Sequence, residues 1–151
     1  MEREMLMFEK KLDKEPLEIK DGIYYFEAHD HGDCFDETDA EEWDNGRLEG
    51  NWKKGKFIEH PKTKKLIETI VVNGKEIIDL ACGPGMGLIP PVKQIDSEFH
   101  CIATDANAML LEHWKRYLDW KRLTYGVGFA QFSVLDMPFR ANSVPAFSSN
   151  I

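Results

Sequence analysis

A short apolar run that leads directly into a glycine-rich turn is the feature that most constrains this chain. Residues 75–81 (KEIIDLA) lack strict alternation of apolar and polar side chains, as expected of a strand covered on both faces of a sheet. Residues 83–87 (GPGMG) follow at once, and glycine lets the backbone turn sharply and come close to a ligand. A helix that begins after such a turn offers free N–H groups to a carboxylate or phosphate. The pattern predicts a buried strand with a ligand site at its carboxyl end.

Strand and helix patterns alternate along the rest of this part of the chain. Pro61 suits the first turn of a helix, and Asn73-Gly74 suits its end. The expected helices cover residues 61–73, 88–95 and 107–123, and the expected strands cover residues 75–81, 99–104, 129–135 and 144–151. This alternation predicts an α/β fold, with a parallel sheet of about four strands and right-handed crossovers.

The first 58 residues have a different character. Asp21-Gly22 lies between two short apolar runs, which is a signal for a β-hairpin. From residue 27 to residue 50 there are ten acidic side chains, a single basic one (Arg47) and little periodicity. We expect residues 1–58 to form an irregular N-terminal cap segment containing the hairpin, and residues 59–151 to form the α/β domain.

An acidic residue lies at or near the end of three expected strands: Asp79, Asp105 and Asp136. In parallel sheets, ligands bind beyond the carboxyl ends of the strands, so these carboxylates are candidate ligand contacts. The dinucleotide fingerprint would start at Gly83 and require glycine or alanine at position 88, which is Leu88. A nicotinamide-dependent enzyme is therefore the weaker alternative. Asp105, taken alone, is also explained as a helix N-cap.

With these motifs in order, the sequence resembles the class I S-adenosylmethionine-dependent methyltransferases, which have a Rossmann-like fold. Their first motif is similar to residues 77–87 (IIDLACGPGMG), with Ala81 in place of the first glycine. Their second element, an acid that closes strand two, is matched by Asp105. Their third, an acid after strand three followed by Pro-Phe, is matched by residues 136–139 (DMPF). The resemblance covers residues 59–151.

The resemblance implies a role for each matched residue. Asp79 would hold the cofactor's α-ammonium group, directly or through water, and Asp105 would accept hydrogen bonds from the ribose hydroxyls. Asp136 would accept from the adenine amino group. The complete set of implied cofactor contacts is Asp79, Ala81, Gly83, Gly85, Asp105, Ala106, Asp136 and Met137.

The implied reaction is methyl transfer from S-adenosylmethionine, with S-adenosylhomocysteine as the product. Holding the nucleophile, methyl group and sulfur in line supplies much of the acceleration, and a general base is needed only for acceptors that lose a proton. No catalytic residue is therefore predicted. A small-molecule acceptor is favoured. Two alternatives remain: a cofactor-binding fragment without activity, and an RNA methyltransferase that uses the lysines between Trp52 and Lys65.

Composition narrows the remaining classes of function. The net charge of −8 disfavours a general nucleic-acid binder. No apolar run has the length of a membrane helix, and the N-terminus lacks a secretory signal pattern, so a cytoplasmic protein is expected. Residues 29–34 (HDHGDC) suggest a metal site, but so short a cluster cannot surround an ion alone, and we interpret it as a solvated acidic loop.

The length of 151 residues bears on how much of the family's fold this sequence is expected to form. The family's sheet has seven strands, and this chain ends where strand four would end. We therefore expect the N-terminal half of a class I methyltransferase fold, truncated after strand four. An exposed sheet edge invites pairing with another chain, so a homo-oligomer is expected.

Overall fold

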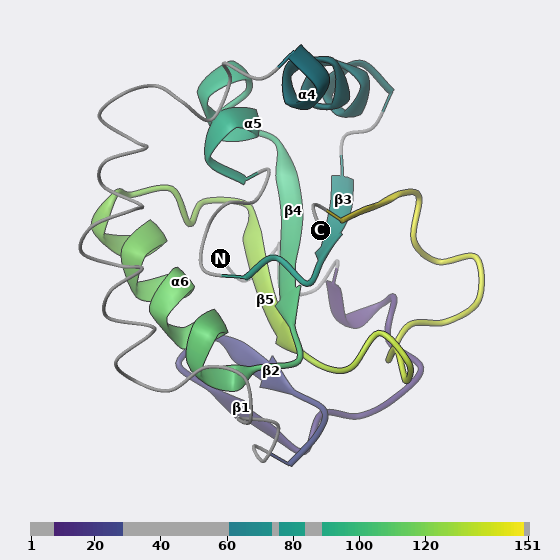
Figure 1. Ribbon diagram of the computed structural model, residues 1–151. Helices are drawn as coiled ribbons and strands as arrows, with labels where there is room; N and C mark the ends of the chain where they lie inside the picture. Colours follow the sequence, from purple (N-terminus) through teal and green to yellow (C-terminus); the bar gives the residue numbers. More distant parts are fainter. Residues whose placement is uncertain (1–7, 29–60, 74–75, 84–88, 150–151) are drawn as a thin grey trace.

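The computed structural model describes residues 8–28, 61–73, 76–83 and 89–149. Six strands and three helices make up the regular structure of these residues. Figure 1 labels helices α4, α5 and α6 and strands β1 to β5. In chain order they are β1 (Glu18–Lys20), β2 (Ile23–Tyr25), α4 (Pro61–Asn73), β3 (Glu76–Leu80), α5 (Ile89–Ile95), β4 (His100–Asp105), α6 (Ala108–Trp120), β5 (Val127–Gln131) and β6 (Phe147–Ser149).

All six strands belong to one sheet, in the order β1-β2-β5-β4-β3-β6. Every neighbouring pair is parallel except β1 and β2, which form the expected hairpin around Asp21-Gly22. Both turn residues have positive φ, 52° and 79°, as hairpin turns of this length require. The four expected strands of the α/β part are present. The hairpin adds two more, because β2 pairs with β5 with Ile23 opposite Phe129.

Both faces of the sheet are buried, which explains the lack of strict alternation in its strands. On one face, side chains such as Ile77, Ala103 and Phe129 pack against α4, α5 and α6. On the other face, Ile78 and Ile102 pack with Phe8 and Leu12 from the N-terminal segment. Successive strand residues point to opposite faces. The N-terminal segment and three helices thus cover the sheet from two sides.

Helix α6 forms where its sequence pattern predicts. Its buried side is the expected stripe, Leu110, Leu111, Trp114, Tyr117 and Leu118, together with His113. The N-cap is Asn107, whose side chain accepts a hydrogen bond from the Leu110 N–H (3.2 Å), so Asp105 is not the capping residue.

The C-terminal end of α6 lies three residues before the expected one. Arg122 takes φ of 57°, and the Leu123 N–H donates to the Leu118 carbonyl (2.9 Å), which closes the helix without a glycine.

The third strand of the α/β part corrects the expectation of residues 129–135. Strand β5 covers Val127–Gln131, two residues earlier at its start and four at its end. A turn follows, in which the Asp136 N–H donates to the Ser133 carbonyl (3.0 Å), and Leu135 is 93% exposed. The apolar residues 134 and 135 resemble the end of a strand in the sequence, but their side chains are exposed to solvent. Asp136 consequently lies five residues beyond the strand.

Among the described residues, no helix combines the length and apolar character needed to cross a membrane.

Candidate functional site

The turn after β3 begins with two residues in the left-handed region of backbone conformation. Ala81 has φ of 50° and Gly83 has φ of 54°. Between them, the N–H of the buried Cys82 donates to the Thr104 carbonyl (2.8 Å), which anchors the turn to β4. Among the described residues, no heavy atom lies within 4 Å of a Cβ placed on Gly83. The described part of the turn therefore leaves open space beside Gly83.

Asp105, the last residue of β4, is held against this turn. Its Oδ2 accepts a hydrogen bond from the Gly83 N–H (2.9 Å), and its Oδ1 accepts one from the Asn107 N–H (2.9 Å). Burial raises the pKa of this carboxyl, while the backbone N–H groups of Asn107 and Gly83 oppose the rise. The structure thus brings together Gly83 and Asp105, which are 22 residues apart in the chain.

Asp79 lies inside the sheet, below the same turn. Its side chain is buried, and its Oδ1 accepts a hydrogen bond from the Ser148 hydroxyl (2.8 Å) on β6. The Thr104 hydroxyl donates to the Asp79 carbonyl (2.9 Å), so β4 and β6 hold this residue from both sides. Sequence reasoning missed Thr104 and Ser148. Their only signal was membership of strands expected to neighbour the first one.

Ala106 lies in the loop after β4, where its carbonyl accepts a hydrogen bond from the Gln131 side chain (2.9 Å). Gln131 is fully buried, and its Oε1 accepts from the Glu27 N–H (3.2 Å). Gln131 therefore links the end of β5 to the loop that carries Ala106 and to the N-terminal segment. The sequence gives no indication of this role.

Asp136 is placed differently from the other two acids. Its side chain is 71% exposed and forms an ion pair with Lys14 of the N-terminal segment. Met137 beside it is 41% exposed, so an apolar side chain lies open next to the carboxylate. The turn beyond β5 thus presents an acid and an apolar surface to solvent.

Several sequence candidates lie outside the described residues: Gly85, the HDHGDC segment at residues 29–34 and most of the lysine-rich segment. Cys82 is described and buried, and burial raises the pKa of its thiol well above the ordinary value. A thiol that stays protonated is a poor nucleophile, so Cys82 has a packing role.

No family model matches this chain, and no curated protein matches it. Among solved structures, it is similar to the MccD protein, with 15% identity and a TM-score of 0.47, over 58% of this chain and 40% of that one.

A second similar structure is geranyl diphosphate C-methyltransferase from Streptomyces coelicolor A3(2) with Mg²⁺, geranyl diphosphate and S-adenosyl-L-homocysteine. Its identity is 16% and its TM-score 0.46, over 73% of this chain and 51% of that one.

A third is the plantazolicin methyltransferase BamL with a triazolic desmethylPZN analog and SAH, at 15% identity and a TM-score of 0.31, over 64% and 41% of the two chains. The chain spans about half the length of these structures or less. At such low identity, its chemistry has to be argued from its own residues.

Proposed function

We propose that this chain binds S-adenosylmethionine at the carboxyl ends of β3 and β4 and belongs to a methyltransferase acting on a small molecule. The observation that carries the proposal is the hydrogen bond between Gly83 and Asp105, beside space that no described residue fills. This hydrogen bond brings together, at the carboxyl ends of two strands, a carboxylate and a stretch of backbone that a ligand can approach closely. In proteins with parallel sheets, ligands bind at the carboxyl ends of the strands.

The residues at these strand ends suit the cofactor's polar groups. A carboxylate has about four lone-pair sites, and the hydrogen bonds from the backbone N–H groups of Gly83, Asn107 and Ala106 leave Asp105 able to accept from a ribose hydroxyl. Asp136 and Met137 offer a carboxylate oxygen and an apolar surface to an adenine ring. Asp79 lies below the turn, where its charge favours the cofactor's ammonium group, directly or through water.

When bound, the cofactor supplies an electrophilic methyl group on a positively charged sulfur. The chain's own contribution is orientation. Asp105 holds the ribose, and the turn at Gly83 holds the backbone that faces the cofactor. Correct placement of the reacting groups supplies much of the acceleration of a displacement reaction.

Titration calorimetry with S-adenosylmethionine and S-adenosylhomocysteine tests the cofactor assignment. We expect saturable binding, weakened by about 1–3 kcal/mol in Asp105→Ala, because a hydrogen bond to a charged group is lost. Asp13→Ala, an exposed carboxylate in the N-terminal segment, is the matched control and should bind normally. The absence of heat from a folded sample at millimolar cofactor would reject the assignment.

Methyl transfer is tested separately, by following S-adenosylhomocysteine formation with a panel of small amines, alcohols and thiols. Product above the no-acceptor control supports the enzyme. Tight cofactor binding without turnover on the panel supports the alternative of a cofactor-binding fragment.

We further propose that the chain self-associates through the edge strand β6. This strand is the last of the described sheet, and Phe147 on it is 47% exposed. An uncovered strand edge can pair with another chain. Light scattering at micromolar concentration should show a dimer or larger species, and a monodisperse monomer would contradict the proposal.

A further inference from the structure

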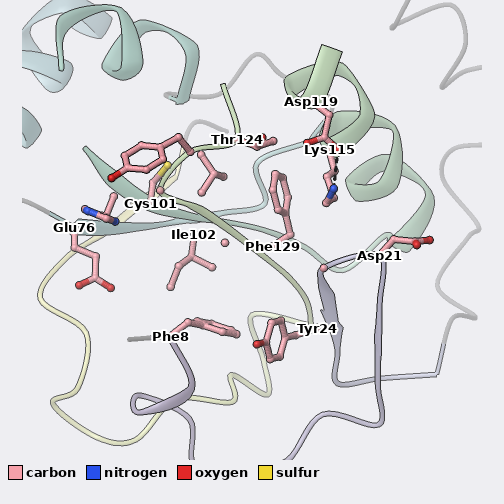
Figure 2. Close-up of a pocket in the computed structure, with 16 residues that line it drawn as sticks. Phe8, Asp21, Tyr24, Glu76, Cys101, Ile102, Lys115, Asp119, Thr124 and Phe129 are labelled. Carbon is pink, nitrogen blue, oxygen red and sulfur yellow. Dashed lines mark hydrogen bonds and ion pairs between the residues drawn. The ribbon is translucent and has the colours of Figure 1, made fainter. Parts of the chain in front are cut away.

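A cavity of about 500 Å³, shown in Figure 2, lies at the amino ends of the parallel strands. It is lined by the first residues of three parallel strands, Glu76, His100 and Val127. The glycine-rich turn and Asp105 lie at the opposite ends of β3 and β4. Because β4 has six residues and a strand rises roughly 3.3 Å per residue, His100 and Asp105 are about 16 Å apart. A ligand in the cavity therefore does not reach the cofactor turn.

The cavity exists because β2 of the hairpin and β5 begin at different levels at the amino ends of the strands. Strand β2 begins with Ile23 opposite Phe129, so Val127 and Gly128 extend beyond its first residue. Gly128 contributes no side chain where it faces Ile102, and a Cβ placed there would lie 3.5 Å from Ile102 Cγ1. The missing side chain leaves space that any larger residue would occupy.

The walls of the cavity are apolar and fixed. Phe8 and Tyr24 form one side, in edge-to-face contact at 4.8 Å between ring centroids. Ile102 and Phe129 form another part of the lining, as Figure 2 shows. All four side chains are buried in the protein, and the Tyr24 hydroxyl is directed to Glu9 (2.9 Å). The surface offered to a ligand is therefore mainly ring and aliphatic carbon.

Lys115, Asp119 and Glu76 at the margin are already paired within the chain, and Asp21 at the hairpin turn is exposed to solvent. Lys115 and Asp119 form an ion pair at 2.7 Å, with the Lys115 ammonium 5.8 Å from the Phe129 ring centroid. Glu76 is paired with Lys11 at 3.3 Å. A charged ligand would have to displace one of these partners or bury its charge without one, which is costly. A neutral ligand avoids this cost.

We propose that this cavity is a second ligand site, which takes a neutral aromatic or apolar small molecule. Ligand pockets in proteins commonly have this size and an apolar lining with a few polar groups. The site is independent of the proposed methyltransferase chemistry, because it lies at the opposite ends of the strands.

The test uses indole as the probe, with the full chain labelled with ¹⁵N and followed by NMR. Saturable shifts are expected for the amides of Gly22 in the hairpin turn, Gly126 before β5 and Gly128 on β5, which all line the cavity. Two charged probes of similar size, phenethylamine and 3-phenylpropanoate, should bind about tenfold more weakly than indole. Linear, unsaturated shifts, or equal binding of all three probes, would overturn the proposal.

Two substitutions at one position sharpen the test. Gly128→Ala adds a Cβ in ordinary contact distance and keeps the fold, while lowering indole affinity by about tenfold. Gly128→Val fills more of the space and should abolish the shifts. Ala141→Val, at an exposed turn outside the cavity lining, is the matched control and should bind indole normally.

Unchanged indole affinity in Gly128→Ala would reject the cavity as the site, whether or not Gly128→Val folds. S-adenosylhomocysteine binding, measured on the same samples, should be the same in all of them. Failure of the indole site and failure of the cofactor site are thereby distinguished.

Discussion

Ala81 is held in a backbone conformation that its own side chain disfavours. Its φ of 50° lies in the left-handed region, where glycine is favoured. The methyltransferase motif has glycine at the matching position. The cost of alanine in this turn is conformational. The turn is kept in this shape by hydrogen bonds to β4, from the Cys82 N–H to the Thr104 carbonyl and from the Gly83 N–H to the Asp105 carboxylate.

Replacing Ala81 with glycine should therefore stabilise the folded chain. The left-handed conformation costs a non-glycine residue roughly 1–2 kcal/mol, and the greater flexibility of unfolded glycine offsets part of the gain, so we expect about 0.5–1 kcal/mol. Urea denaturation measures the difference. Ala141→Gly, at an exposed position with ordinary φ, should be neutral or destabilising. A loss of stability in Ala81→Gly would contradict the argument.

Asp105 predicts a pH dependence of cofactor affinity. Burial raises its pKa above the ordinary value of 3.8, and the ribose hydroxyls would donate to the charged carboxylate. Affinity should thus be full at neutral pH and fall as the pH drops through the raised pKa, because protonation removes an acceptor. The stability of the folded chain depends on pH in the opposite sense. The folded chain holds the Asp105 proton more tightly than the unfolded chain, so acidification stabilises the folded state through this group.

Calorimetric titration with S-adenosylhomocysteine between about pH 4.5 and pH 7.5 follows the affinity while circular dichroism confirms that the chain stays folded. An affinity that does not change with pH would remove Asp105 from the ribose contact.

At the scale of elements, one lysine joins three segments on the amino side of the sheet. Lys93 of α5 is buried, and its ammonium donates to the carbonyls of Ser97, Phe99 and Tyr125. These carbonyls belong to the segments that lead into β4 and into β5, so a single side chain links α5 to the starts of both strands. Gly126 lies close to this ammonium group. A Cβ at position 126 would come within 3.2 Å of the Lys93 ammonium, which favours glycine there.

Lys93→Met keeps the length of the side chain and removes the donor. We expect the folded state to lose about 2–4 kcal/mol, because three partly or fully buried carbonyls lose a charged partner. Thermal unfolding measures the loss. Lys65→Met, an exposed position on α4, should change stability by less than about 0.5 kcal/mol. Equal effects of the two substitutions would show that the carbonyls are satisfied by water.

The sequence predicts elements well where local chemistry determines them. Pro61, Asn107 and the Asp21-Gly22 pair each mark a helix start or a turn, and the structure has them there. The third strand of the α/β part was misplaced, because Gly128 weakens the strand pattern where the strand exists and Val134-Leu135 imitates it where the chain turns.

The contacts of the candidate site could not be predicted in the same way. The motif predicted that Gly83 and Asp105 would share an edge of the sheet, but not that they would bond directly. The ion pair of Asp136 with Lys14 joins residues 122 apart, and no local pattern encodes such a pairing. Assignment of the cofactor contacts stays a prediction.

At the scale of the molecule, the N-terminal hairpin is part of the same core as the helices. Ile23 and Tyr25 from β2 pack with Leu111 and Trp114 from α6. The Tyr25 hydroxyl also donates to Glu112 (2.9 Å). Damage to the hairpin should therefore destabilise the helical layer as well.

Ile23→Ala tests this coupling. Ile23 is buried, and truncating such a residue costs about 2–5 kcal/mol, so the whole described fold should unfold at lower denaturant. Ile19→Ala, on the neighbouring strand with 48% exposure, should cost much less. Far-ultraviolet circular dichroism and tryptophan fluorescence should give coincident transitions. Separate transitions would show that the hairpin folds independently.

The pairing of β2 with β5 also has a consequence for how the protein is made. Glu27 accepts a hydrogen bond from the Ser133 N–H, 106 residues later, and Ile23 pairs with Phe129. During synthesis, the tyrosines and isoleucine of β2 leave the ribosome long before their partner strand is translated. They must remain uncovered, or be covered by a chaperone, until β5 at residues 127–131 has emerged.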